Sequence, residues 1–221
     1  MRVEGIGKEG QAKLAASSVL IVGAGALGSP LAMYLGGAGV GKIIIADFDT
    51  VELTNLHRQI FYTERDAGKS KSRLLESRIK NLNSDIEVVC LESLVTKRFL
   101  EDLPVSFSMI ADCADNPSTT YLLDNYCFAH SIPLSTAGVS GWSAQVFTYI
   151  PGSVRYSDLF LPPDDAGAIL PCSITGITGP TAAFASSLQA TQIMKTLLGM
   201  AEKSSLLAAD LLSLNVQVAS I

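Results

Sequence analysis

Three glycines near the start of the chain have the spacing of a phosphate-binding turn. Gly23, Gly25 and Gly28 form a Gly-x-Gly-x-x-Gly motif directly after the apolar run 18–22, and Asp47 follows Gly28 by nineteen residues. Glycines at these positions permit a tight turn, and the helix that follows presents unpaired N–H groups and its positive dipole end to phosphate. An acidic residue at this distance can accept hydrogen bonds from ribose hydroxyls. The motif predicts an adenosine nucleotide, either ATP or a dinucleotide.

Charged residues further along the chain separate these two ligands, because a triphosphate carries more charge to neutralise. Arg58 lies in the stretch 54–59, Lys71 ends the stretch 68–71, and Asp115 lies in 112–116. The planar guanidinium of Arg58 can donate two parallel hydrogen bonds to phosphate oxygens, and the ammonium of Lys71 can bind them as a point charge. Asp115, just beyond a strand end, can hold Mg²⁺. Each residue taken singly could be a solvated loop charge. Their joint occurrence in this order favours ATP.

The composition excludes several classes of protein. Apolar residues make up 48% and charged residues 17% of the 221 positions, and the net charge is −5. Because no stretch is rich in lysine and arginine, nucleic acid is not expected as a partner. No apolar run reaches the roughly 18 to 20 residues of a membrane helix, and the first twenty residues lack a signal-peptide core. We therefore expect no membrane association and a cytoplasmic location.

The cysteines and histidines further restrict the metal sites and catalytic nucleophiles that the chain can form. The four cysteines contain no C-x-x-C pair, which is typical of a chain in a reducing compartment. Cys90, Cys113 and Cys127 lie in expected strands or helices and are interpreted as packing residues. Only two histidines are present, so His-rich metal sites and most His-dependent nucleophiles are poorly supplied. The chemistry is expected to depend on other residues.

Hydrophobic periodicity and turn residues predict an α/β fold. Strands are expected at 18–22, 42–47, 86–91, 107–112, 133–136, 144–150 and 206–212. Helices are expected after the glycine turn, ending within 36–41, and at about 71–82, 119–130 and 180–198, where Gly199 is the stop signal. Residues 151–171 contain four prolines and predict a long irregular crossover. The expected fold is one Rossmann-like, three-layer domain over 1–221, whose mixed sheet is parallel first and antiparallel later.

The order and spacing of the motifs resemble the ThiF/MoeB/HesA family across nearly the whole chain. The residues that carry the resemblance are Gly7–Gln11, the glycine turn, Asp47–Asp49, Asn55–Gln59, Gly68–Lys71, Asp112–Asn116, Cys172 and the helix before Gly199. The family consists of adenylyltransferases that activate ubiquitin-like sulfur carriers for the synthesis of thiamine and molybdopterin. The resemblance implies ATP and Mg²⁺ as ligands.

The resemblance also implies roles for individual residues. Arg58 and Lys71 would act on the phosphates, Asp115 would hold Mg²⁺, and Cys172 would engage the activated carrier or the sulfur. Cys172 could equally be a small buried hydrophobe. The residues that would bind or organise the nucleotide are Gly23, Gly25, Ala26, Gly28, Asp47, Asp49, Asn55, Arg58, Gln59, Lys71, Asp115 and Asn116.

The implied reaction agrees with the scarcity of histidine. A C-terminal carboxylate with a pKa of about 3.3 to 3.7 is already ionised at neutral pH, so its attack on the α-phosphorus of ATP needs no general base. The expected partner is a small carrier that ends in Gly-Gly, with sulfur supplied by another protein because no sulfurtransferase segment follows. A homodimer is expected, with the helix 180–198 at its interface.

Two departures from the family pattern leave alternatives open. Residues 154–158 read Val-Arg-Tyr-Ser-Asp, where many relatives have one of two zinc-binding C-x-x-C pairs, so no zinc is expected. An arginine-bearing segment that reaches the partner's nucleotide in relatives would precede Met1. The alternatives are a non-catalytic relative that serves as a binding module and a nicotinamide-dependent oxidoreductase that uses the same glycine turn.

Overall fold

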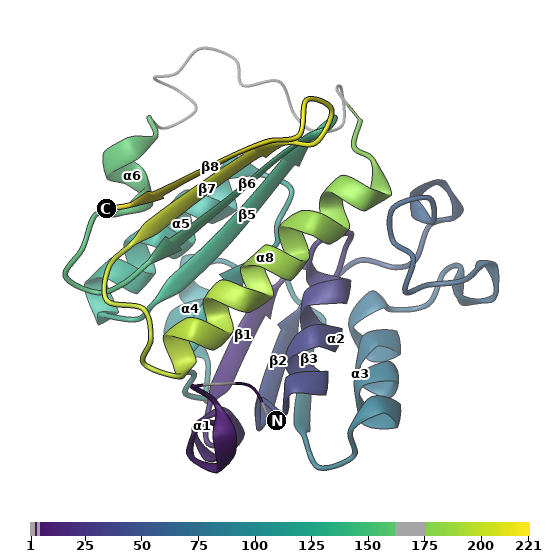
Figure 1. Ribbon diagram of the computed structural model, residues 1–221. Helices are drawn as coiled ribbons and strands as arrows, with labels where there is room; N and C mark the ends of the chain where they lie inside the picture. The colour runs from purple at the N-terminus through teal and green to yellow at the C-terminus, as the bar shows by residue number, and fades with distance from the viewer. Residues whose placement is uncertain (1–2, 4, 162–175) are drawn as a thin grey trace.

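A mixed eight-stranded sheet forms the centre of the computed structural model, which describes residues 3, 5–161 and 176–221 (Figure 1). The strand order is β3-β2-β1-β4-β5-β6-β7-β8. Strands β1 to β5 are parallel, and β6, β7 and β8 each pair antiparallel with the preceding strand. The strands are β1 (Ser18–Val22), β2 (Lys42–Ala46), β3 (Glu87–Leu91), β4 (Met109–Asp112), β5 (Leu134–Ser140), β6 (Ser143–Tyr149), β7 (Ser205–Asp210) and β8 (Asn215–Ser220).

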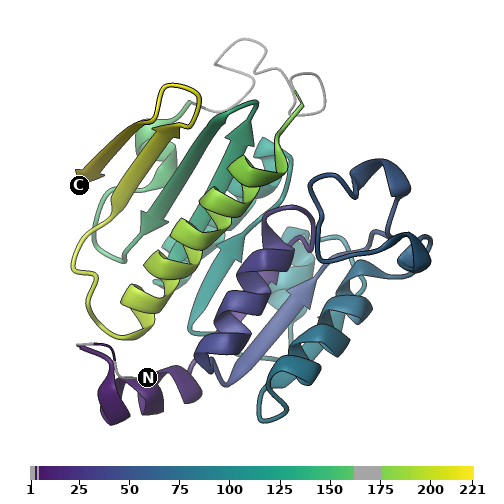
Figure 2. The same cartoon turned by 45° about the vertical axis from the view of Figure 1, so that its right-hand side comes forward.

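Helices cover both faces of the sheet. In Figure 2 the helices α2, α3 and α8 lie on one face, and the helices α4 and α5 lie behind it. The described helices are α1 (Gly7–Ala15), α2 (Gly28–Ala38), α3 (Lys71–Leu82), α4 (Lys97–Asp102), α5 (Pro117–His130), α6 (Tyr156–Leu159) and α8 (Gly179–Leu197), with short 3-10 turns at Leu53–Asn55 and Glu64–Asp66. The three-layer mixed fold expected from the sequence is confirmed.

Burial on both faces explains why the central strands are apolar almost throughout. Ile43, Ile44 and Ile45 of β2 are fully buried, and their side chains alternate between the two cores. A strand covered by helices on both sides has no solvent-facing positions, so its sequence shows no polar alternation. The two apolar cores therefore fix the parallel half of the sheet, at whose carboxyl edge the glycine turn lies.

Several predicted boundaries change in the structure. Strand β5 continues to Ser140, four residues beyond the predicted end, because β6 pairs with it along its length. Strand β7 ends at Asp210 rather than 212, where the Asp210 carboxylate accepts hydrogen bonds from Leu212 N and Ser213 Oγ and forms a turn. The segment predicted to be irregular from 151 to 171 contains the short helix α6, and residues 162–171 lie outside the described part of the chain.

The sequence prediction did not include α1, α4 or β8. All six residues of β8 are exposed, so this strand has no buried alternate positions and no periodic signal. It forms because its backbone pairs with β7. Helix α4 has six residues and a single buried side chain, Leu100, which is too little for a helical pattern.

Helix α8 buries small residues inside this subunit. Ala182, Ala185, Ser186 and Ala190 on one face are buried, and the helix packs on β5, β6 and α2. Small side chains allow a helix to lie close to a sheet, so its composition has an internal cause. A homodimer remains a prediction, and this face of α8 is not available for its interface.

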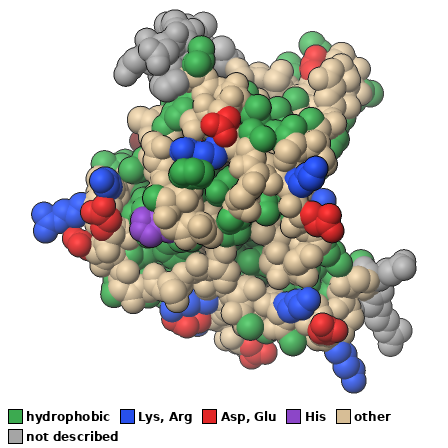
Figure 3. Space-filling view, turned by 90° about the vertical axis from the view of Figure 1, so that its left-hand side faces the viewer, with side chains coloured by type: hydrophobic (Ala, Val, Ile, Leu, Met, Phe, Trp, Pro, Cys, Tyr) green, Lys and Arg blue, Asp and Glu red, His purple; other side chains and the backbone are tan. Residues whose placement is uncertain are grey.

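The low charge of the sequence is also visible on the surface. In Figure 3 the charged side chains are scattered among apolar and uncharged ones. None of the described helices combines the length and the apolar content needed to cross a membrane.

Candidate active site

The glycine turn joins β1 to α2 with no room for side chains at two of its positions. Gly23 has a φ of +95°, and a Cβ there would lie 2.7 Å from the carbonyl oxygen of Cys113. A Cβ on Gly28 would overlap the carbonyl oxygen of Gly23. Gly25 has only Gln59 Nε2 nearby, at 3.4 Å from an added Cβ. Gly23 and Gly28 are therefore required by the turn, while Gly25 keeps the backbone open toward the cavity.

Asp47 connects this turn to the end of β2. Its carboxylate accepts a hydrogen bond of 2.6 Å from Ala24 N and one of 2.7 Å from Asp49 N, and the residue is 8% exposed. Burial raises the pKa of Asp47, while the two backbone donors and the nearby Lys71 oppose that rise. The carboxylate thus holds the glycine turn through the Ala24 N–H. Because Asp47 lines the cavity, its remaining lone pairs can accept hydrogen bonds from ribose hydroxyls.

Lys71 is a buried cation at the first position of α3. Lys71 is 4% exposed, and its Nζ donates a hydrogen bond to Asp49 Oδ2 at 2.9 Å. The Asp49 side chain is half-exposed, so the pair lies at the cavity wall and not in the core. An ammonium carries three donors, and two of them are available to a ligand after this bond.

Arg58 lies in the loop between β2 and α3, and no described carboxylate is within ion-pair distance of it. Its guanidinium donates to Asn55 Oδ1 at 2.6 Å and lies 3.3 Å from His57 Nε2. Asn55 therefore orients the guanidinium from behind and does not line the cavity itself. Because no described carboxylate neutralises the guanidinium, its charge is available to an anionic ligand.

Gln59 follows Arg58 and has a buried acceptor without a donor. The residue is 6% exposed and lines the cavity, and its Oε1 has no hydrogen-bond partner among the described residues. Buried polar atoms in folded proteins are nearly always paired. This orphan oxygen is the kind of group that a ligand hydroxyl or amine would satisfy.

Two anchors hold the loop that carries Arg58 and Gln59. The Tyr62 hydroxyl donates to the carbonyl oxygen of Ala24 at 2.7 Å and ties the loop to the glycine turn. Asp66 accepts from Thr63 Oγ1 at 2.8 Å and from Arg78 Nη2 of α3 at 2.8 Å. These bonds position the loop against both elements that bound the cavity.

Asp66 is expected to make the stability of the protein sensitive to acid. Its pKa is lowered from 3.8 to about 2, first by the Thr63 hydroxyl and further by the Thr63 N–H and Arg78. A lowered pKa in the folded state gives stability that is present above about pH 4 and is lost as the pH falls toward 2. We expect Asp66→Asn to remove a contribution on the order of 1–2 kcal/mol at pH 6 and almost none at pH 2. Urea unfolding at both pH values checks this, and an equal loss at both would contradict it.

Asp115 and Asn116 lie between β4 and α5 and have different roles. Asn116 caps α5, where its Oδ1 accepts from Thr119 N at 2.9 Å. The exposed carboxylate of Asp115 has no hydrogen-bond or ion-pair partner among the described residues, and it lines the cavity. An unpaired carboxylate on a cavity wall can bind a hard divalent cation together with ligand oxygens.

The buried Asp112 holds the loop that presents Asp115. Its carboxylate accepts hydrogen bonds from Thr120 Oγ1 at 2.7 Å, Thr136 Oγ1 at 3.1 Å and Ala114 N at 3.1 Å. Burial raises the pKa of Asp112, and these donors oppose the rise. One carboxylate thereby joins β4, β5 and the first turn of α5.

A cavity of about 530 Å³ lies at the carboxyl ends of the parallel strands and collects most of the predicted residues. This is where ligands bind in doubly wound sheets. Gly28 and Asn55 lie behind the wall, and Cys172 lies outside the described residues. The predicted residues on the wall are Gly23, Gly25, Ala26, Asp47, Asp49, Arg58, Gln59, Lys71, Asp115 and Asn116.

The ThiF family model matches residues 1–221 of this sequence. The chain belongs to the ThiF family. Among its relatives, the sulfur carrier protein ThiS adenylyltransferase of Escherichia coli K12 is 36% identical over 198 residues, which are 90% of this chain and 79% of that protein. The SAMP-activating enzyme E1 of Haloferax volcanii is 34% identical over 89% of this chain and 73% of that protein.

Other ThiF-family relatives are longer than this chain. The adenylyltransferase and sulfurtransferase MOCS3 of Caenorhabditis briggsae is 37% identical over 95% of this chain, which spans about half, 52%, of that protein. The crystal structure of Escherichia coli MccB with ATP superposes with a TM-score of 0.83 at 24% identity, covering 96% of this chain and 65% of that chain. The superposition supports the fold that this ThiF-family chain adopts.

Sequence reasoning missed part of the cavity wall in this ThiF-family chain. Gly138 lies beyond the predicted end of its strand, Tyr156 lies in a segment predicted to be irregular, and Ile177 lies just before α8. Phe48 and Leu94 also line the wall, although both are more than half exposed. Phe48 could have been identified as a residue of the cavity wall because it directly follows Asp47. No local sequence pattern marks the other four residues.

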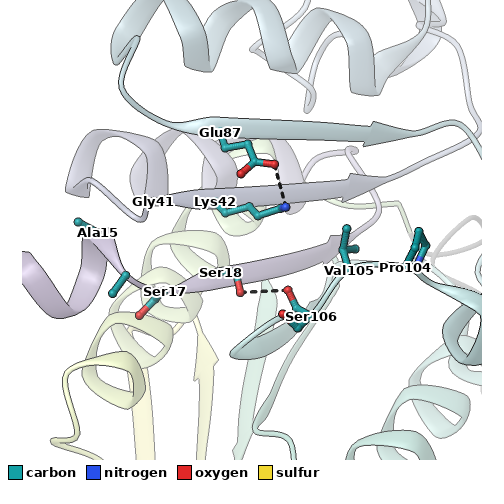
Figure 4. A pocket seen from close by; sticks show the side chains of 10 residues that line it. Ala15, Ser17, Ser18, Gly41, Lys42, Glu87, Pro104, Val105 and Ser106 are labelled. Carbon is teal, nitrogen blue, oxygen red and sulfur yellow. Dashed lines mark hydrogen bonds and ion pairs between the residues drawn. The ribbon is translucent and has the colours of Figure 1, made fainter.

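A second hollow of about 440 Å³ lies at the opposite edge of this ThiF-family fold, by the amino ends of β1 and β2 (Figure 4). Its lysine, Lys42, is neutralised by Glu87 at 2.8 Å, and the Ser18 hydroxyl donates to the carbonyl oxygen of Ser106 at 3.3 Å. The charges here are paired within the protein, so this hollow offers less to an ionic ligand than the cavity at the carboxyl edge, which is the candidate active site.

Proposed function

We propose that this chain is an adenylyltransferase that activates the C-terminal glycine of a small ubiquitin-like sulfur carrier with ATP. The observation that carries this proposal is the pair Arg58 and Asp115, a cation and a carboxylate without ionic partners among the described residues, on the wall that also contains the glycine turn. The names of the relatives, which include a ThiS adenylyltransferase and a SAMP-activating enzyme, support the same reaction.

The residues around the cavity suit a nucleoside triphosphate. The glycine turn offers backbone N–H groups to phosphate, Asp47 accepts ribose hydroxyls, and the orphan oxygen of Gln59 accepts a donor from the nucleoside. Arg58 and Lys71 supply positive charge for the phosphates. A nicotinamide dinucleotide needs the turn and Asp47 but has no need of both cations, which favours ATP.

The reaction joins a carrier carboxylate oxygen to the α-phosphorus. As this bond forms, the bond from the α-phosphorus to the bridging oxygen breaks, and its electron pair leaves with pyrophosphate. Arg58 and Lys71 would neutralise the charge that grows on the leaving group, and the carboxylate arrives already ionised. The product is an acyl-adenylate, which a sulfur nucleophile can attack.

Asp115 would hold Mg²⁺ at this site. The fit rests on its carboxylate, which faces the cavity without an ionic partner among the described residues. Mg²⁺ in protein sites typically takes one or two carboxylates together with phosphate oxygens. The ion would supply charge neutralisation at the phosphates, while Asp112 and its threonine donors keep the Asp115 loop in place.

The remaining partners belong to this proposal. The carrier would end in Gly-Gly, another protein would supply sulfur, two copies of the chain would form a homodimer, and the reaction would take place in the cytoplasm. Cys172, outside the described residues, would engage the carrier or the sulfur after adenylation.

Gly138 supplies a test of where the carrier tail enters. This residue of β5 lines the cavity, is exposed, and would direct a Cβ into open space. We expect Gly138→Val to raise KM for the carrier by about tenfold and to leave KM for ATP within twofold, because the added side chain narrows the tail path. Steady-state kinetics with each substrate varied in turn measures both. A larger effect on ATP would place the tail elsewhere.

Carrier-dependent exchange of labelled pyrophosphate into ATP tests the function itself. Exchange that requires both the carrier and Mg²⁺ supports adenylation. A purified, folded chain that binds NADH tightly and shows no exchange would favour the oxidoreductase, and one that binds a carrier without exchange would favour a binding module.

A further inference from the structure

The helix α6 is attached to α5 by a buried ion pair. Arg155 Nη2 lies 2.8 Å from Asp124 Oδ2, and the two side chains are 18% and 1% exposed. The same nitrogen donates to Asn125 Oδ1 at 2.8 Å, and the guanidinium lies over the ring of Phe128, 4.1 Å from its centroid. Removing either partner would leave the other as an uncompensated buried charge. The two side chains therefore stay paired and hold α6 against α5.

The same carboxylate fixes the next residue, Tyr156. Asp124 Oδ1 accepts from Tyr156 N at 3.1 Å. The Tyr156 ring packs against Tyr121 at 5.5 Å, Phe147 at 5.7 Å and Phe160 at 4.6 Å between centroids. A ring held by its backbone and by three aromatic neighbours has little freedom to turn.

Tyr156 is a residue of the cavity wall whose hydroxyl has no partner among the described residues. The first turn of α5 lines the same wall. Tyr121, by comparison, donates to the carbonyl oxygens of Phe160 and Leu161. Burial raises the pKa of Tyr156 to about 12, so its hydroxyl stays protonated throughout the physiological range.

We propose that Tyr156 donates a hydrogen bond to an anionic oxygen of the substrates in this cavity, and that the Asp124–Arg155 pair positions it. The proposal rests on the proposed adenylation, in which the reacting groups, a carboxylate and a phosphate, are rich in acceptors and have no donors. A hydrogen-bond donor that its neighbours hold in place is suited to such an oxygen. It does not have to reorient when negative charge develops on that oxygen in the transition state.

The hydroxyl is tested by Tyr156→Phe, which keeps the ring and its packing. We expect carrier-dependent pyrophosphate exchange to fall about 10- to 100-fold, as for the loss of one hydrogen bond to a charged group. Calorimetry with ATP alone separates the two oxygens. Weaker ATP binding assigns the bond to phosphate, and unchanged ATP binding with slower exchange assigns it to the carrier carboxylate. Exchange within twofold of wild type, in a wild type that is active, would overturn this inference and leave the proposed function standing.

The matched control is Tyr126→Phe on the neighbouring helix α5. The Tyr126 hydroxyl donates to the carbonyl oxygen of Leu100, and the residue is absent from the cavity wall. We expect exchange by this variant to stay within twofold of wild type. A wild type without exchange would remove the proposed function and this inference together.

A double-mutant cycle tests the positioning role of Asp124. If Asp124 acts through the Tyr156 hydroxyl, Asp124→Asn slows exchange, and adding Tyr156→Phe to it slows exchange little further. A purely structural role for Asp124 predicts that the two effects multiply, and that result would refute the positioning role. Arg155→Lys keeps the positive charge but loses the guanidinium group. We expect this variant to retain more pyrophosphate exchange than Arg155→Ala.

Discussion

Arg58→Ala is expected to lower kcat for carrier-dependent pyrophosphate exchange by about 100- to 1,000-fold. The reason is that few charged side chains described on the cavity wall are without an ionic partner. Lys71 is paired with Asp49 at 2.9 Å, while the Arg58 guanidinium hydrogen-bonds to the side chains of Asn55 and His57 and has no carboxylate partner among the described residues. Arg58 is therefore the cation best able to respond to charge that develops on pyrophosphate. Single-turnover formation of the adenylate measures the effect on the chemical step.

Two matched variants give this prediction its controls. Arg58→Lys keeps the charge but loses the planar fork, and it is expected to fall between wild type and alanine. Arg65→Ala removes an exposed arginine from the same loop, away from the cavity wall, and is expected to leave exchange unchanged. A folded Arg58→Ala protein with more than a third of wild-type exchange would show that Arg58 does not stabilise the leaving group.

Gly28→Ala is expected to lower the free energy of unfolding by about 3 kcal/mol or more. The added methyl would overlap the carbonyl oxygen of Gly23, and only a shift of the backbone at the start of α2 could relieve this overlap. The turn lies between β1, of which four of five residues are buried, and the largely buried α2, so such a shift would disturb both cores. Urea unfolding followed by circular dichroism gives the change in stability.

Gly37→Ala is the matched control in the same helix. Its added methyl would lie 3.6 Å from Leu82 Cδ2, an ordinary contact, and the position has no positive φ. Alanine is favoured over glycine within helices, so we expect this variant to gain up to roughly 1 kcal/mol. Equal losses for the two variants would show that general helix effects, and not the Gly23 contact, explain the result.

The local patterns were reliable where burial imposes them. The runs 18–22 and 42–47 predicted the central strands closely, because strands covered on both faces must be apolar along their whole length. The glycine spacing predicted the turn because no other residue fits at Gly28. Asp112–Asn116 was placed at a strand end from the apolar run before it, and the structure agrees.

The patterns failed where an element depends on pairing with a distant segment. Strand β8 has no buried side chains and exists because β7 lies beside it, and β5 extends to Ser140 because β6 pairs with it. Neither interaction leaves a periodic signal in the strand concerned. The extension of β5 places Gly138 on the cavity wall, so this error also removed a site residue from view.

The sequence alone determined which residues could do chemistry at the candidate site, since the glycine turn, Asp47, Arg58, Lys71 and Asp115 lie in local motifs. Only the tertiary structure decided how they are held and which of them are free. It paired Lys71 with Asp49, left Arg58 and Asp115 without ionic partners among the described residues, and brought Tyr156 to the wall through Asp124. The physical reason is that residue type and local spacing are properties of neighbouring positions, whereas charge pairing and burial depend on segments that folding brings together.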